Sequence, residues 1–176
     1  MSKTTPFDVG EASDGSSCTS GPHAFAVLGL PVRAVLERDI LDVAYATKHK
    51  ECLTRCLRDQ TPVDICYGYI NRAYKVLHDP ISRAELVVHV RGGEGDVGGD
   101  LSPQDLMHYF SLQEEVEACE GEGLQTMCAT LAKSLTDALE GIDRASDTSA
   151  MTEALTKARY VSRLITTLKR KLDEIL

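Results

Sequence analysis

The sequence has no tryptophan, few aromatic side chains and no long apolar run. Aromatic residues make up only 5% of the 176 positions, whereas hydrophobic residues make up 43%. A core would therefore be built mainly from Leu, Val, Ile and Ala side chains, which suits packed helices. No apolar stretch approaches the ~20 residues that a membrane-spanning helix needs.

Basic residues are outnumbered by acidic ones. The chain has 19 Lys and Arg against 27 Asp and Glu, a net charge of −8. Because phosphate binding needs a basic face, this balance argues against a nucleic-acid partner. The first residues include acids, almost no Arg and no apolar block. We therefore expect neither a secretory signal nor a mitochondrial presequence, and we expect a cytoplasmic location.

Motifs of catalysis are also missing. The sequence has no Gly-rich phosphate loop, no nucleophile motif and no metalloprotease-type His pair, which are the usual local signatures of those chemistries. We expect that the chain is not an enzyme, that it has no catalytic residue and that it needs no cofactor.

The cysteines do not form the pattern of a small disulfide-bonded scaffold. They are Cys18, Cys52, Cys56, Cys66, Cys119 and Cys128. Four lie in or beside helical patterns, so we expect reduced thiols that act as small hydrophobes. As an alternative, His49, Cys52 and Cys56 share one helical face at i, i+3 and i+7, and Cys66 could approach from a facing helix to complete a zinc site. No CxxC pair is present, and we assign no metal ligand.

The most informative local pattern covers residues 70–92. One helical face is formed by residues at three- and four-residue steps: Ile70, Ala73, Tyr74 and Leu77. Pro80 lacks an N–H and disfavours helical backbone at Asp79, so a first helix should end near His78. Asp79 can cap a second helix, and Pro80 suits the first turn of that helix. The pattern predicts a helix, a sharp corner and a new helix.

This stretch resembles the end of the J domain in the HscB-type co-chaperones of iron–sulfur cluster assembly. The family pattern I-N-x-A-Y-x-x-L-x-D-P-x-x-R-A-E is met at every fixed position from Ile70 to Glu85. A generic helix–proline–helix corner gives no reason for Asn71, Arg83 and Glu85 to occur together. The segment from residue 25 to residue 31 is also closely similar to the F-x-x-x-G-L-P opening of this J domain.

The resemblance extends over roughly residues 24–176 and implies an all-α fold. It predicts a J-like domain at 23–91, which contains a helical hairpin (38–58 and 63–78), and an antiparallel three-helix bundle at 102–176. The two parts are expected to form an L. The periodicity itself supports the bundle, with amphipathic helices beginning near Ser102, Leu124 and Thr148. We expect residues 92–101 to be a linker. Residues 1–22 have too few large apolar side chains to offset their ordering entropy and should be disordered.

One departure from the family concerns the chaperone partner. In J proteins the second helix presents a basic face to the ATPase domain of the chaperone and leads into a His-Pro-Asp tripeptide that triggers ATP hydrolysis. The aligned positions here hold Leu53, Thr54 and Arg55, and the tripeptide occurs nowhere in the chain. The candidate chaperone-binding residues are therefore only the basic ones on this helix, Lys48, Lys50 and Arg55.

The resemblance also implies a docking patch for the iron–sulfur scaffold protein (IscU-type). The matching positions are Leu106, Met107, Phe110 and Glu114, together with Tyr160 on the last helix. Leu112 and Val116 lie on another side of the same helix. This side and the side of the docking residues cannot both face the bundle equally. The alternative is that Leu106 and Phe110 are ordinary core residues.

These patterns predict a co-chaperone that binds the scaffold protein, delivers it to a DnaK/HscA-type chaperone and regulates the ATPase of that chaperone, with no nucleic-acid or membrane partner. One alternative is a scaffold-binding adaptor that no longer stimulates the ATPase. A second is a small metal-binding helical protein.

Overall fold

The computed structural model describes residues 23–60, 62–92, 101–121 and 123–174, and the predicted all-α fold is confirmed there. The described residues form seven helices and no strand. The helices are α1 (Ala24–Leu28), α2 (Arg38–Asp59), α3 (Val63–His78), α4 (Pro80–Val90), α5 (Pro103–Ala118), α6 (Gly123–Arg144) and α7 (Thr148–Asp173). The predicted tail at 1–22 and most of the predicted linker lie outside the described residues.

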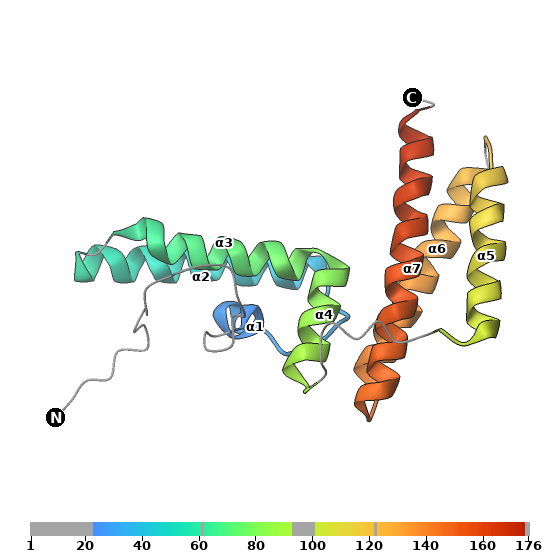
Figure 1. The fold of residues 1–176 in the computed structure, drawn as a ribbon. Helices are drawn as coiled ribbons and strands as arrows, with labels where there is room; N and C mark the ends of the chain where they lie inside the picture. The colour runs from blue at the N-terminus through green and yellow to red at the C-terminus, as the bar shows by residue number, and fades with distance from the viewer. Residues whose placement is uncertain (1–22, 61, 93–100, 122, 175–176) are drawn as a thin grey trace, which may run out of the picture.

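The helices form an L (Figure 1). One arm is the long antiparallel hairpin of α2 and α3, with α1 packed beside it; the other is the upright bundle of α5, α6 and α7. Helix α4 lies at the corner, where it contacts α3, α6 and α7.

The predicted helix ends are confirmed by their caps. Helix α3 ends at His78, and the carboxylate of Asp79 accepts a hydrogen bond from the Ser82 N–H at 2.7 Å to begin α4. Ser102 caps α5 in the same way, accepting from the Asp105 N–H at 3.1 Å. These side chains satisfy N–H groups that have no partner within their own helix.

The motif residues that a generic corner does not require each connect two elements. Asn71 on α3 accepts a hydrogen bond from the Tyr45 hydroxyl on α2 at 2.9 Å. Arg83 is only 7% exposed and donates to the carbonyl oxygens of Ala34 and Leu77. Glu85 accepts from Arg159 of α7 at 2.7 Å. The motif therefore holds the hairpin, the corner and the bundle in one arrangement.

The arm formed by α1 to α4 and the bundle share a hydrophobic core. Buried residues of α1 to α4, among them Phe25, Leu77 and Val87, belong to the same cluster as Leu139 of α6 and Leu155 of α7. A second cluster lies between α5, α6 and α7 at the far end of the bundle; its buried members are Tyr109, Val116, Leu124, Leu131, Val161, Leu164 and Leu168. The first cluster fixes the angle of the L.

The prediction that the cysteines are reduced is wrong for one pair. A disulfide joins Cys52 of α2 to Cys66 of α3, with the Cα atoms 6.4 Å apart. Antiparallel packing brings the two residues opposite each other although 14 positions separate them in sequence, within the Cα separation that a disulfide spans. Cys56, Cys119 and Cys128 are free.

Candidate docking groove between helices α5 and α7

Helix α5 divides its apolar residues between two faces. Tyr109 and Val116 are buried against the bundle, and Leu112 packs beside them. Leu106, Met107 and Phe110 are 37%, 71% and 58% exposed. The alternative that Leu106 and Phe110 are core residues is therefore wrong, because Tyr109 takes the inward position between them.

The exposed face borders a groove of about 130 Å³ between α5 and α7. The groove is lined by Leu106, Tyr109, Phe110, Gln113, Tyr160, Arg163 and Leu164. The ring of Tyr160 stacks on that of Tyr109, with centroids 5.3 Å apart. The Arg163 guanidinium lies 5.7 Å from the centroid of the Tyr160 ring, within cation–π range.

Three of the five predicted scaffold-binding residues, Leu106, Phe110 and Tyr160, thus meet at one groove. Met107 and Glu114 are exposed on α5 outside its lining. The other lining residues were not among those predicted; besides the buried Tyr109 and Leu164 they are Gln113 and Arg163. Gln113 and Arg163 are the polar members of this group. Each lies three positions after a predicted residue on the same helix, and this spacing was the signal that could have found them.

Both ends of α5 are fixed to α7, which keeps the groove in shape. At the start, the carboxylate of Asp105 lies 3.2 Å from the Lys157 ammonium; the hydrogen bond from Ser102, followed by that from Lys157, lowers the pKa of Asp105. Hydrogen bonds to Glu153 and then to Asp105 raise the pKa of Lys157. At the end, Lys171 donates to the carbonyl oxygen of Val116 at 3.0 Å.

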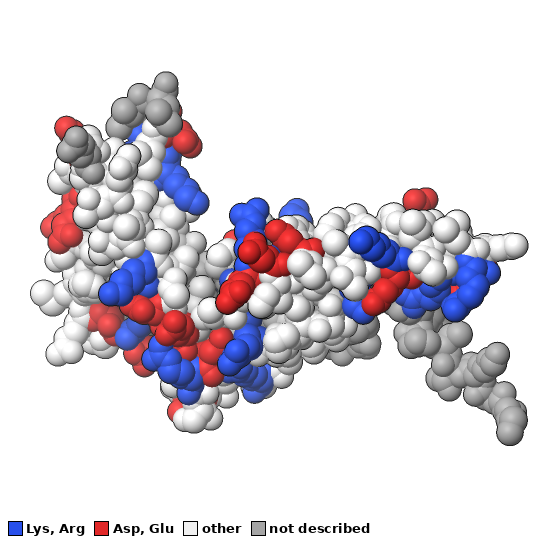
Figure 2. Space-filling view, turned by 180° about the vertical axis from the view of Figure 1, so that it is seen from behind, with Lys and Arg blue, Asp and Glu red and all other residues white. Residues whose placement is uncertain are grey.

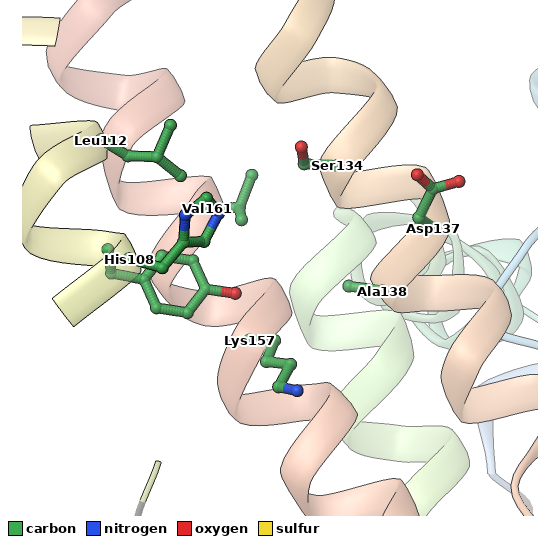
Figure 3. A pocket seen from close by; sticks show the side chains of 8 residues that line it. His108, Leu112, Ser134, Asp137, Ala138, Lys157 and Val161 are labelled. Carbon is green, nitrogen blue, oxygen red and sulfur yellow. The ribbon is translucent and has the colours of Figure 1, made fainter. Parts of the chain in front are cut away.

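A second hollow of about 300 Å³ opens on another side of α5 (Figure 3). Its lining comes from α5, α6 and α7: His108, Tyr109, Leu112, Ser134, Asp137, Ala138, Lys157 and Val161. In this described part of the chain, no hydrogen bond joins His108, Ser134 and Asp137 to one another.

The predicted chaperone-binding residues lie on α2. Lys48 pairs with Glu51 at 2.8 Å, and Lys50 and Arg55 are exposed. Figure 2 shows Lys and Arg gathered toward the free end of the hairpin, on the right of that view, with a few acids among them. The positions aligned with the tripeptide, 53–55, are helical, because α2 continues to Asp59. Position 54 is Thr instead of a proline, so nothing stops the helix there.

The cysteines of the zinc alternative lie together, but its histidine is separate. The Sγ atoms of Cys52, Cys56 and Cys66 are all within 4.8 Å of one another. His49 instead places its Nε2 atom 3.0 Å from the side-chain oxygen of Asn71. The His49 ring also packs against Tyr45 and Tyr67, with centroid distances of 4.4 and 4.3 Å.

None of the described helices has the length and apolar content needed to cross a bilayer. No protein-family model matches the chain. Among curated proteins, it is 24% identical over 168 residues to a co-chaperone protein HscB homolog of Mannheimia succiniciproducens, covering 87% of this chain and 97% of that protein. It is 25% identical over 167 residues to the homolog of Vibrio cholerae, with coverages of 86% and 98%. The homolog of Burkholderia mallei is 29% identical over 119 residues, with coverages of 62% and 67%.

Two solved structures share the fold. The chaperone HscB of Vibrio cholerae superposes with a TM-score of 0.65 at 23% identity, covering 88% of this chain and 100% of that one. Human co-chaperone protein HscB gives a TM-score of 0.67 at 20% identity, with coverages of 91% and 86%. In sequence and in fold, the chain is therefore similar to HscB-type co-chaperones over nearly its whole length, which supports a co-chaperone role.

Proposed function

We propose that this protein is a cytoplasmic co-chaperone of iron–sulfur cluster assembly. It binds the cluster scaffold protein (IscU-type) through the α5–α7 groove and delivers it to a DnaK/HscA-type chaperone, whose ATPase it regulates. The observation that carries the proposal is the exposure of Leu106, Met107 and Phe110 beside that groove. The protein itself supplies binding and positioning, and ATP hydrolysis takes place on the chaperone.

The groove has the composition of a protein-binding site. Phe110 offers a large apolar side chain beside an aromatic pair, and Met107 is flexible enough to adapt to a partner surface. Glu114 follows Phe110 by one helical turn and is exposed, so it can orient a basic partner surface and speed association. Arg163 stacks over Tyr160 at the opposite wall.

Replacing Phe110 with alanine is expected to weaken scaffold binding about tenfold, since buried aromatic anchors dominate the energetics of such interfaces. Because Phe110 is 58% exposed in the free protein, its loss leaves no cavity and should leave stability unchanged. Tyr160→Ala should weaken binding as well. Isothermal titration calorimetry with the purified scaffold protein measures the affinity, and urea unfolding checks the fold.

The matched control is Ile65→Ala, which trims an apolar side chain that is 62% exposed on α3 in the other arm. This variant should bind the scaffold with unchanged affinity. An affinity of Phe110→Ala equal to that of the Ile65→Ala control would show that the scaffold docks elsewhere.

The adaptor alternative is favoured by one observation, the continuous helix through positions 53–55. Steady-state ATPase rates of the chaperone, with and without scaffold, separate the two functions. We expect this protein to stimulate the chaperone ATPase severalfold. A Lys50→Glu/Arg55→Glu variant should lose this stimulation, because charge reversal on α2 repels the chaperone surface that the basic face of α2 attracts. Absence of stimulation while the scaffold still binds would instead establish an adaptor.

A further inference from the structure

Beyond the docking function, three cysteines meet near the free end of the hairpin. Cys52 and Cys56 are one turn apart on α2, with their Sγ atoms 3.9 Å apart, and Cys66 faces them from α3. A tetrahedral zinc ion with Zn–S bonds of about 2.3 Å separates two of its sulfur ligands by roughly 3.8 Å. The spacing on α2 therefore fits two ligands of one ion, and the third sulfur is within reach.

The free end of the hairpin is also where a cross-link has most to stabilise. It projects beyond α1 into solvent (Figure 1), and its apolar residues Leu53, Leu57 and Ile65 are 42%, 70% and 62% exposed. An end of a two-helix hairpin that leaves these side chains exposed gains stability from a covalent or metal cross-link. Cys52 and Cys56 are by contrast 0% and 6% exposed, and Cys66 is half-buried beside them.

We propose that Cys52, Cys56 and Cys66 form a zinc-binding thiolate site in the reduced protein, which alternates with the Cys52–Cys66 disulfide of the oxidised protein. An added dithiol reduces the disulfide and becomes a cyclic disulfide itself, leaving two thiols beside that of Cys56. Zn²⁺ then displaces a proton from each thiol that it binds, and water fills the fourth position. Disulfide and zinc use the same two sulfur atoms, so each state excludes the other.

The test uses the full chain, reduced with dithiothreitol and freed of reductant under anaerobic conditions. Titration with Zn²⁺ against a chromophoric chelator should give one equivalent bound per chain, with release of protons into weakly buffered solution. Titration with Co²⁺ should give the thiolate-to-metal charge-transfer band and the intense d–d bands of a tetrahedral site. The oxidised protein should show neither signal.

Cys56→Ser is the decisive variant, because Cys56 is outside the disulfide. It should bind Zn²⁺ at least tenfold more weakly while still forming the Cys52–Cys66 bond on oxidation. Cys18→Ser and Cys128→Ser are the matched controls and should bind zinc as the parent does. Equal zinc affinity of Cys56→Ser and the controls would overturn the proposal. If Cys56→Ser does not fold, the titrations of the parent protein are sufficient. A reduced parent protein that binds no Zn²⁺ and shows no thiolate-to-Co²⁺ band would overturn the proposal.

Discussion

Replacing Arg83 with methionine is expected to lower the free energy of unfolding by about 3 kcal/mol, because two carbonyl groups lose a charged hydrogen-bond donor and cannot reach water. The guanidinium donates from Nε to the Ala34 oxygen at 2.8 Å and from Nη1 to the Leu77 oxygen at 2.5 Å. Burial lowers the pKa of Arg83, but a guanidinium stays protonated in proteins, so the effect should not vary with pH near neutrality. Methionine keeps much of the side-chain volume, which separates the lost hydrogen bonds from a packing defect.

Urea unfolding followed by circular dichroism measures the change. Arg33→Met is the matched control, since Arg33 is exposed on the connection between α1 and α2, and surface substitutions usually shift stability by less than about 0.5 kcal/mol. A urea concentration at the unfolding midpoint that is as high for Arg83→Met as for Arg33→Met would show that the buried guanidinium does not hold the corner together.

Local features of the fold were predictable from the sequence. The end of α3 at His78 and the cap of α4 by Asp79 follow from one Asp-Pro pair, whose backbone restrictions act within a few residues. The start of α5 at Ser102-Pro103 has the same origin. Such signals depend on neighbours in sequence, so one chain is enough to find them.

Contacts between distant segments were not predictable in this way. Periodicity shows which face of a helix is apolar but not which helix it meets. The disulfide between Cys52 and Cys66 and the ion pair between Glu85 and Arg159 both depend on how helices align after packing. The sequence placed Cys52 on a helical face with His49, yet packing turns the His49 ring toward Tyr67 and Asn71.

The residues of the candidate groove were predictable only in part, because the groove forms between two helices that are distant in sequence. The resemblance pointed to Leu106, Phe110 and Tyr160, and their grouping required only two helices. Tyr109 lies between Leu106 and Phe110 in sequence but faces inward, 9% exposed, and it lines the groove with its ring stacked on that of Tyr160. Burial raises the pKa of its phenol.

The second large expected effect concerns the joint between the two arms. Asp143 near the end of α6 accepts hydrogen bonds from the Ala34 and Val35 N–H groups at 2.8 and 3.0 Å. It also lies 3.4 Å from the Arg91 guanidinium, which reaches the carbonyl oxygen of Val32. Asp143→Ala should lower the free energy of unfolding by about 2 to 3 kcal/mol, because the buried Ala34 N–H then has no acceptor.

Amide hydrogen exchange measured by NMR locates this effect. The Ala34 amide should lose protection in Asp143→Ala and keep it in Asp137→Ala, which removes an exposed carboxylate from the same helix. Because Asp143 and Arg83 hold the N–H and the C=O of the same residue, the double variant should lose less stability than the sum of the two single changes, by about 1 kcal/mol. Strict additivity would mean that the two side chains act on residue 34 independently of each other, which would contradict a shared anchor at this joint.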